Sequence, residues 1–105
     1  MNTTGGDVVA SARPRRRAHL RARAVEGELV ILDRERQLIH QLNQTASYIW
    51  RRCDGQHSVT AIARDVAQVF DVGRQTAEND VAHAIRQLDA AGLIEVPAAR
   101  PTSVT

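Results

Sequence analysis

The side chains best suited to nucleophilic or metal chemistry are few and scattered. The chain has one cysteine, Cys53, and four histidines, His19, His40, His57 and His83. No two histidines have the H-x-x-x-H spacing of paired metal ligands on a helix, and no phosphate-binding glycine loop or nucleophile elbow is present. A lone cysteine in an apolar setting favours a buried structural thiol over a nucleophile. These residues predict no catalytic residue, no metal site and no cofactor.

The charge of the chain is divided between an N-terminal segment and the remainder. All 14 basic residues are arginine, against 12 acidic residues. Residues 1–23 hold six arginines and one aspartate, whereas residues 24–96 hold seven arginines and eleven acidic residues. The basic pI therefore comes from the N-terminal segment. A mildly acidic remainder does not favour nucleic acid as a partner, because phosphates would repel it.

The length of 105 residues suits one domain with its own core. Residues 1–19 and 97–105 are polar, small or basic without an apolar period, and we expect both to be disordered tails that stay out of the core. The folded domain is expected over residues 20–96. No apolar stretch reaches the length of a signal peptide or a membrane span, which predicts a cytoplasmic protein without a membrane partner.

The first part of the expected domain has strand-like patterns. We expect three strands, over residues 20–25, 29–32 and 37–42. In the first, apolar residues alternate with arginine, as in an edge strand with one buried face. Glu26 and Gly27 supply the turn that follows. The three strands predict an antiparallel meander, which needs a helical layer to be stable.

The rest of the domain has helical periodicity. Helices are expected over residues 45–53, 59–70 and 74–91. Asn43 or Thr45 can cap the first helix and Ser58 the second, while Gly92 suits the left-handed position after the third. The predicted class is α+β and winged-helix-like, with a three-stranded antiparallel sheet followed by three helices.

The second and third expected helices also resemble a helix-turn-helix, so a winged-helix DNA-binding regulator is the alternative function. However, the first turns of the third helix carry Glu78 and Asp80, where a DNA reader presents basic or amide side chains. Phosphate repulsion would oppose docking, although the arginine-rich tail could bind nucleic acid without specificity.

Five phrases between residues 29 and 95 together carry a family resemblance. They are Leu42-Asn43-x-Thr45-Ala46-x-x-Ile49-Trp50, Asp54-Gly55, Val59-x-x-Ile62-Ala63, Ala77-x-x-Asp80-Val81 and Leu88-x-x-x-Gly92-Leu93-Ile94. In this order and spacing they resemble the PqqD-like peptide chaperones, which are recognition elements of ribosomally made, post-translationally modified peptides. Residues 33–36 depart from the phrase of the quinone-cofactor branch, which leaves the lasso-peptide and other branches open.

The resemblance implies a non-catalytic adaptor that binds the leader of a precursor peptide as an extra strand. The leader would lie beside the third strand, in a groove whose other wall is the third helix. The residues implied to contact it are Gln37, Leu38, Ile39, His40, Gln41, Asp80, Val81, Ala84, Ile85 and Leu88. A helical apolar stripe usually packs inward, which favours the core for Ile85 and Leu88 and the groove for Asp80 and Ala84.

The implied partners are the precursor leader and a modifying enzyme, which could be a radical enzyme, a cyclase or a leader protease. An exposed strand edge could also pair with a second copy of the chain, giving a homodimer.

Overall fold

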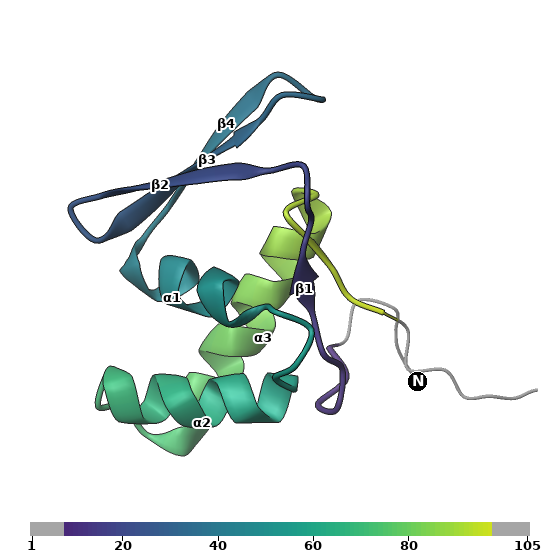
Figure 1. Cartoon of the computed structure of the whole chain (residues 1–105). Helices are drawn as coiled ribbons and strands as arrows, with labels where there is room; N and C mark the ends of the chain where they lie inside the picture. The colour runs from purple at the N-terminus through teal and green to yellow at the C-terminus, as the bar shows by residue number, and fades with distance from the viewer. Residues whose placement is uncertain (1–7, 98–105) are drawn as a thin grey trace, which may run out of the picture.

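The fold was analysed in a computed structural model that describes residues 8–97. A three-stranded antiparallel sheet has the order β2-β3-β4, and three helices lie together on one side of it (Figure 1). The elements are β1 (Arg15–Arg16), β2 (Arg21–Val25), β3 (Glu28–Asp33), β4 (Leu38–Leu42), α1 (Gln44–Arg52), α2 (Val59–Val69), α3 (Arg74–Ala90) and β5 (Ile94–Glu95). The predicted class, a three-stranded antiparallel sheet followed by three helices, is confirmed.

The central strand, β3, anchors the sheet to the helices. Leu29, Ile31 and Asp33 are buried on its inner face, whereas the alternate residues are only half-buried. The turn before it is formed by Glu26 and Gly27, both with positive φ (53° and 85°), as a tight hairpin turn requires. The alternation of β3 therefore defines an inner face toward the helices and an outer face away from them.

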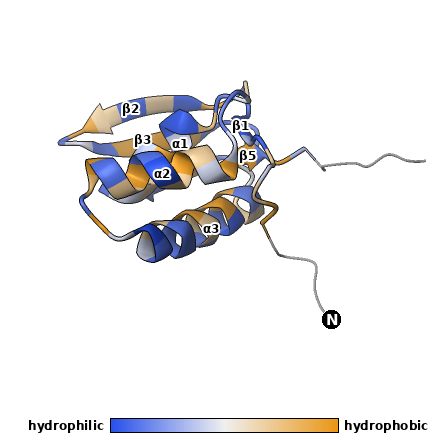
Figure 2. Ribbon diagram, turned by 90° about the horizontal axis from the view of Figure 1, so that it is seen from below, coloured by the Kyte–Doolittle hydropathy of each residue, from blue (hydrophilic) through white to orange (hydrophobic). Residues whose placement is uncertain are grey.

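The first strand of the sheet, β2, corrects one expectation. It was predicted to have one buried face, but all five of its residues are exposed. Figure 2 shows its arginines alternating with less polar residues, so the pattern is present. The inward-facing residues, Ala22 and Ala24, lie opposite Ile31 and Leu29, yet the helices do not cover them. An alternating pattern shows which residues share a face, but not whether another element packs against that face.

The helix ends follow the predicted capping residues. Asn43 accepts a hydrogen bond from the Ala46 amide (2.8 Å), and Ser58 caps α2 in the same way through the Ala61 amide (3.0 Å). These bonds satisfy amides that have no partner within the helix. Gly92 has a φ of 77° and follows the end of α3, as predicted.

The core lies between the sheet and the helices and continues between α2 and α3. Its fully buried side chains include Ile31 from the sheet, Ile49 from α1, Val66 from α2 and Val81 and Ile85 from α3. Ser47 connects three elements, because its hydroxyl accepts from the Leu29 amide (2.9 Å) and donates to the Leu42 carbonyl (3.1 Å). The junction between β4 and α1 is thereby held in place.

The segment before β2 corrects a second expectation. Residues up to 19 were predicted to stay outside the core, which is wrong for Ala12 and Pro14. Ala12 and Pro14 are buried, and β1 pairs with β5 (Figure 1). The carbonyls of Ala10 and Ala12 accept hydrogen bonds from the Thr60 and Val59 amides (3.1 and 2.9 Å).

The physical reason is that this segment is held by backbone hydrogen bonds. It supplies carbonyls to first-turn amides of α2, which have no acceptor inside the helix. Such bonds need no apolar period, so the sequence pattern does not reveal them. The remaining parts of the two predicted tails, residues 1–7 and 98–105, lie outside the described residues.

Candidate functional site

The β4 edge of the sheet is accessible and carries exposed apolar side chains. In the described part of the chain, β4 pairs only with β3. Leu38 and Ile39 are 45% and 71% exposed, and no residue of β4 carries a formal charge at neutral pH. The other side of β4 therefore offers backbone N–H and C=O groups to an extended chain.

A groove of about 360 Å³ runs between β4 and α3. Leu42 and Ala46 line it beside β4, and Ala84 and Leu88 line it from α3. On the α3 wall, the small side chain of Ala84 leaves space in the groove. Leu88, which is 3% exposed, gives the wall an apolar surface. A groove of this composition suits an apolar side chain rather than a charged one.

A second hollow of about 250 Å³ continues the groove toward the start of α1. The two hollows share Ala46, Ala84 and Gln87. Asp80 and His83 line the second hollow from α3, opposite the capping region of α1. The site is therefore apolar beside β4 and more polar where β4 leads into α1.

One end of the groove is bounded by the turn between β3 and β4. Arg36, in this turn, donates to the carbonyl of the groove residue Ala91 (3.4 Å). Its guanidinium also lies where a side chain on Gly92 would be, because a Cβ there would be 2.7 Å from Arg36 Nη1. Gly92 is thus favoured for its positive φ, and its lack of a Cβ leaves room for the guanidinium of Arg36.

Asp33 stabilises the same turn from inside the sheet. Its Oδ1 accepts from the Arg36 amide and lies 3.2 Å from His19 Nε2. Burial alone would raise the pKa of Asp33, but the bond from Arg36 and the neighbouring His19 lower it more, so the pKa falls below its ordinary value. An ionised Asp33 therefore holds the turn that borders the groove.

Of the residues that the resemblance implies as leader contacts, some line the two hollows and others do not. Six of the ten line the two hollows: Ile39, His40, Gln41, Asp80, Ala84 and Leu88. Val81 and Ile85 are buried in the core and are not among the lining residues. Leu38 lies on β4 outside the groove, and Gln37 is not in the strand at all. Gln37 has a φ of 57°, which places it in the turn.

Sequence reasoning missed several lining residues, of which some had a readable signal. On α3, Gln87 and Ala91 follow Ala84 at helical spacings of three and seven, so the same stripe predicts them. On the other wall, Asn43 and Thr45 were expected only as capping residues, and Ala46 only as part of a phrase that carries the resemblance. Only the position of α1 relative to α3 makes them part of the hollow.

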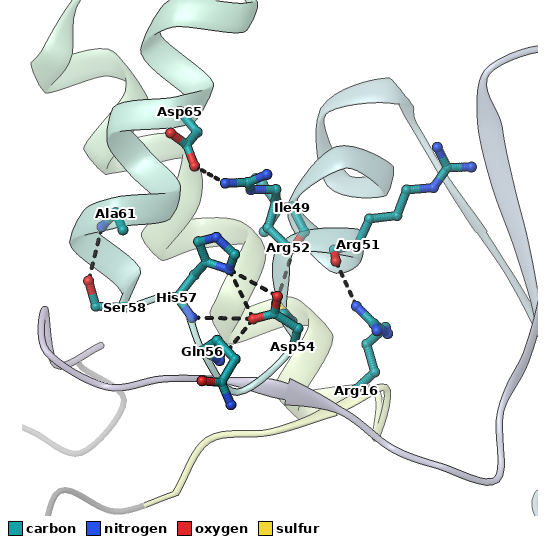
Figure 3. Close-up of polar contacts among 11 residues, drawn as sticks. Arg16, Ile49, Arg51, Arg52, Asp54, Gln56, His57, Ser58, Ala61 and Asp65 are labelled. Carbon is teal, nitrogen blue, oxygen red and sulfur yellow. Dashed lines mark hydrogen bonds and ion pairs between the residues drawn. The ribbon is translucent and has the colours of Figure 1, made fainter.

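The remaining reactive groups lie away from the groove. Cys53 is fully buried, and burial raises the pKa of its thiol to about 12, so the thiol keeps its proton at neutral pH. Asp54 contacts His57 and Gln56 in the loop between α1 and α2 (Figure 3). The hydrogen bond from His57, with help from the Gln56 amide, lowers the pKa of Asp54 to about 2. This loop is a structural polar cluster.

The described residues lack both a cluster of metal-ligating side chains and a membrane-spanning helix. No group of three or more His, Cys, Asp or Glu side chains there gathers closely enough to hold a metal ion. Within residues 8–97, no helix is long and apolar enough to cross a membrane.

Comparison with protein families gives a match over most of the chain. The model described as "Coenzyme PQQ synthesis protein D (PqqD)" matches residues 28–94. The chain belongs to the PqqD family. The matched range includes β3, β4 and all three helices, so it contains both walls of the groove. A search of the curated proteins found no match.

Solved structures share the fold of this PqqD-family chain. "Lasso peptide synthetase B1 complexed with the leader peptide" is 28% identical, with a TM-score of 0.70 over 79% of this chain and 98% of that chain. "TbiB1 in Complex with the TbiA(beta) Leader Peptide" is 21% identical, with a TM-score of 0.71 over 82% and 99%.

A third structure is the PqqD truncation of Methylobacterium extorquens PqqCD. It is described as a functional and stand-alone recognition element of ribosomally synthesized and post-translationally modified peptides. It is 24% identical, with a TM-score of 0.68 over 84% of this chain and 94% of that chain.

Proposed function

We propose that this PqqD-family chain is a non-catalytic adaptor that binds the leader of a ribosomal precursor peptide and presents it to a modifying enzyme. The observation that carries the proposal is the unpaired β4 edge, which lies directly beside the groove formed with α3. Two of the similar structures contain leader peptides by their own descriptions. We propose that the modifying enzyme is a radical enzyme, a cyclase or a leader protease.

The two parts of the site would make different contributions to binding. The backbone of β4 would align any extended peptide through main-chain hydrogen bonds, whereas the groove would select the side chains that fit. Side chains of an added strand alternate in direction, so every second one would point into the groove. We propose His40, Asp80, Ala84 and Leu88 as side-chain contacts, with Leu42 and Gln87 in addition. Ile39 and Gln41 lie opposite Leu32 and Val30 on the face away from the helices, so they would contact the leader through their backbone. Gln37, Leu38, Val81 and Ile85 would act indirectly, through the turn and the core.

The same surface argues against docking of α3 on DNA. Glu78 and Asp80 are both exposed near the start of α3, where a recognition helix would approach phosphates. Four of the six N-terminal arginines lie instead on β1 and β2, not at the start of α3. A non-catalytic role is supported by Cys53, whose thiol is buried with a pKa raised to about 12.

The test is a titration of isotope-labelled chain with the leader of the precursor peptide encoded beside it. We expect amide shifts along Leu38–Leu42 and at Ala84 and Gln87, together with slower hydrogen exchange at the β4 edge. Shifts confined to residues before β2 would contradict strand addition and leave only electrostatic binding by arginine. Salt-sensitive duplex binding that survives deletion of the segment before residue 20 would favour the DNA-binding alternative.

A homodimer through β4 would use the edge that the leader needs. Self-association and leader binding would then exclude one another. Sedimentation of the chain with and without leader distinguishes the two: leader should convert any dimer to a complex of one chain and one peptide.

A further inference from the structure

The outer face of the three-stranded sheet is left uncovered by the described helices, which all lie on the opposite side (Figure 1). We use "outer face" for the surface formed by Arg21, Arg23, Val30, Leu32 and Ile39. Val30 and Leu32 are only half-buried, and Ile39 is 71% exposed. These are large apolar side chains on a surface that the fold itself does not use.

The strand register arranges these residues in two rows. In one row, Arg21 lies opposite Leu32, which lies opposite Ile39; in the other, Arg23 lies opposite Val30, which lies opposite Gln41. Val30 and Leu32 therefore occupy the centre, Ile39 stands on β4, and both arginines stand along β2, the border farthest from β4. An apolar centre bordered by arginine is the composition of a protein interface rather than of an ordinary solvated surface.

The charges of the outer face indicate the charge of its partner. Glu28 projects from the same face, but it stands at the end of β3 and accepts a hydrogen bond from Gln41 (3.3 Å). Neither Arg21 nor Arg23 forms an ion pair with any residue in the range 8–97. A partner with carboxylates around an apolar patch would complement this border.

The outer face is continuous with the strand that a leader would form. Every second side chain of a leader paired with β4 would stand on this face beside Ile39. A fourth strand beside the three widens this face by about a third, so a partner would contact more surface on the leader-loaded chain than on the empty chain and would bind it more tightly.

We propose that the outer face is the surface on which the modifying enzyme docks, through a patch with an apolar centre and an acidic border. The proposal rests on the proposed function and adds a second site to it. The leader occupies the β4 edge, and the enzyme reads the combined surface of the sheet and the leader. Presentation of the leader is then a direct consequence of strand addition.

The test uses the full chain, a fluorescent leader of the precursor encoded beside it, and the purified modifying enzyme from the same gene neighbourhood. The variant is Arg21→Glu with Arg23→Glu, which changes two exposed side chains and leaves the groove intact. We expect leader affinity to change less than twofold and enzyme affinity for the loaded chain to fall at least tenfold. The matched control is Arg64→Glu with Arg74→Glu, two exposed residues of the helices, which should leave both affinities unchanged.

The outcomes separate this inference from the function on which it rests. Failure of the wild-type chain to bind the leader would overturn the proposed function. Enzyme affinity is therefore measured both with and without leader, so that the docking surface is tested separately. Unchanged enzyme affinity in the double variant would overturn the docking surface while leaving leader binding in place. Binding of a short DNA duplex that only this variant abolishes, with enzyme affinity unaffected, would assign the two arginines to nucleic acid instead.

Discussion

The outer strands of the sheet, β2 and β4, have the same backbone geometry but different surroundings. β4 is uncharged and borders a groove whose other wall is α3. β2 carries Arg21 and Arg23, and all of its residues are exposed. Charged side chains on an edge discourage pairing with other strands. The two edges of this small sheet therefore differ in how readily another strand can pair with them. The β4 edge, the proposed leader site, has no charged arginine, whereas the arginines of β2 discourage pairing.

The difference also concerns what each strand contributes to stability. β4 contributes the half-buried Leu42, which packs against the core, and it leads into α1 through the junction held by Ser47, whereas no residue of β2 packs against the core. β4, beside the proposed leader site, is therefore attached directly to the core of the domain. β2 is attached to that core through β3 alone, which leaves its side chains available for other contacts.

The largest effect should come from removing a side chain that joins the sheet to the helices. Ile31→Ala, at a fully buried position of β3, should lower the free energy of unfolding by about 2–5 kcal/mol, because it leaves a cavity. Val25→Ala in β2, at a side chain 49% exposed, should change it by less than about 0.5 kcal/mol. Chemical denaturation measures both; similar losses would show that β2 is as much a part of the core as β3. Ile31→Val is the milder variant if Ile31→Ala does not fold.

The next effect concerns the groove that distinguishes β4. Ala84→Phe places a ring in the space between β4 and α3, and leader affinity should fall roughly 100-fold, as fluorescence anisotropy would measure. The matched control is Ala82→Phe, since Ala82 lines a hollow beside Val59 of α2 instead. If both variants bind the leader equally well, the groove is not where the peptide lies.

A smaller effect should follow from making the β2 edge resemble β4. Arg21→Thr with Arg23→Thr removes the two charges and adds residues that favour strands, so self-association should strengthen about tenfold. Sedimentation over a range of concentrations measures it, with Arg64→Thr and Arg74→Thr as the control pair. Unchanged sedimentation would mean that features other than charge keep this edge unpaired.

The smallest expected effect is on the pH dependence of stability, and it comes from Asp54, which lies away from both edges of the sheet. Because the pKa of Asp54 is lowered from 3.8 to about 2, its ionised form stabilises the fold fully above pH 3.8. That contribution is lost as the pH falls through about 2. Thermal melts should show an acid-dependent loss that is reduced in Asp54→Asn. If the variant loses stability over the same acid range as the wild type, other carboxylates are responsible.

The elements and much of the groove were predictable because their signals are local. The alternation in β3, the caps at Asn43 and Ser58, and Gly92 each act within a few residues of their position. The resemblance implied Asp80, Ala84 and Leu88 as contacts from α3, whereas the apolar stripe by itself favoured the core for Leu88, which also lines the groove. Gln37 was wrongly predicted to belong to the strand. Its positive φ arises from the geometry of the turn, and glutamine is not a residue type that indicates positive φ.

Contacts made through the backbone, or across the fold, were not predictable. Residues 8–17 hold α2 and β5 by main-chain hydrogen bonds, which leave no periodic pattern in the sequence. The exposure of β2 depends on whether the helical layer extends far enough to cover it. The residue types of Ala22 and Ala24 do not predict this.

By itself, then, the sequence determined the three strands of the larger sheet, the three helices, most of the turns between them, and which residues share a face. These follow from local periodicity, capping and backbone conformation. Only the tertiary structure decided that the groove opens beside β4 and that β2 stands uncovered. That choice depends on where α3 lies against the sheet, which is set by the packing of side chains such as Ile31, Val81 and Ile85 that are distant in sequence.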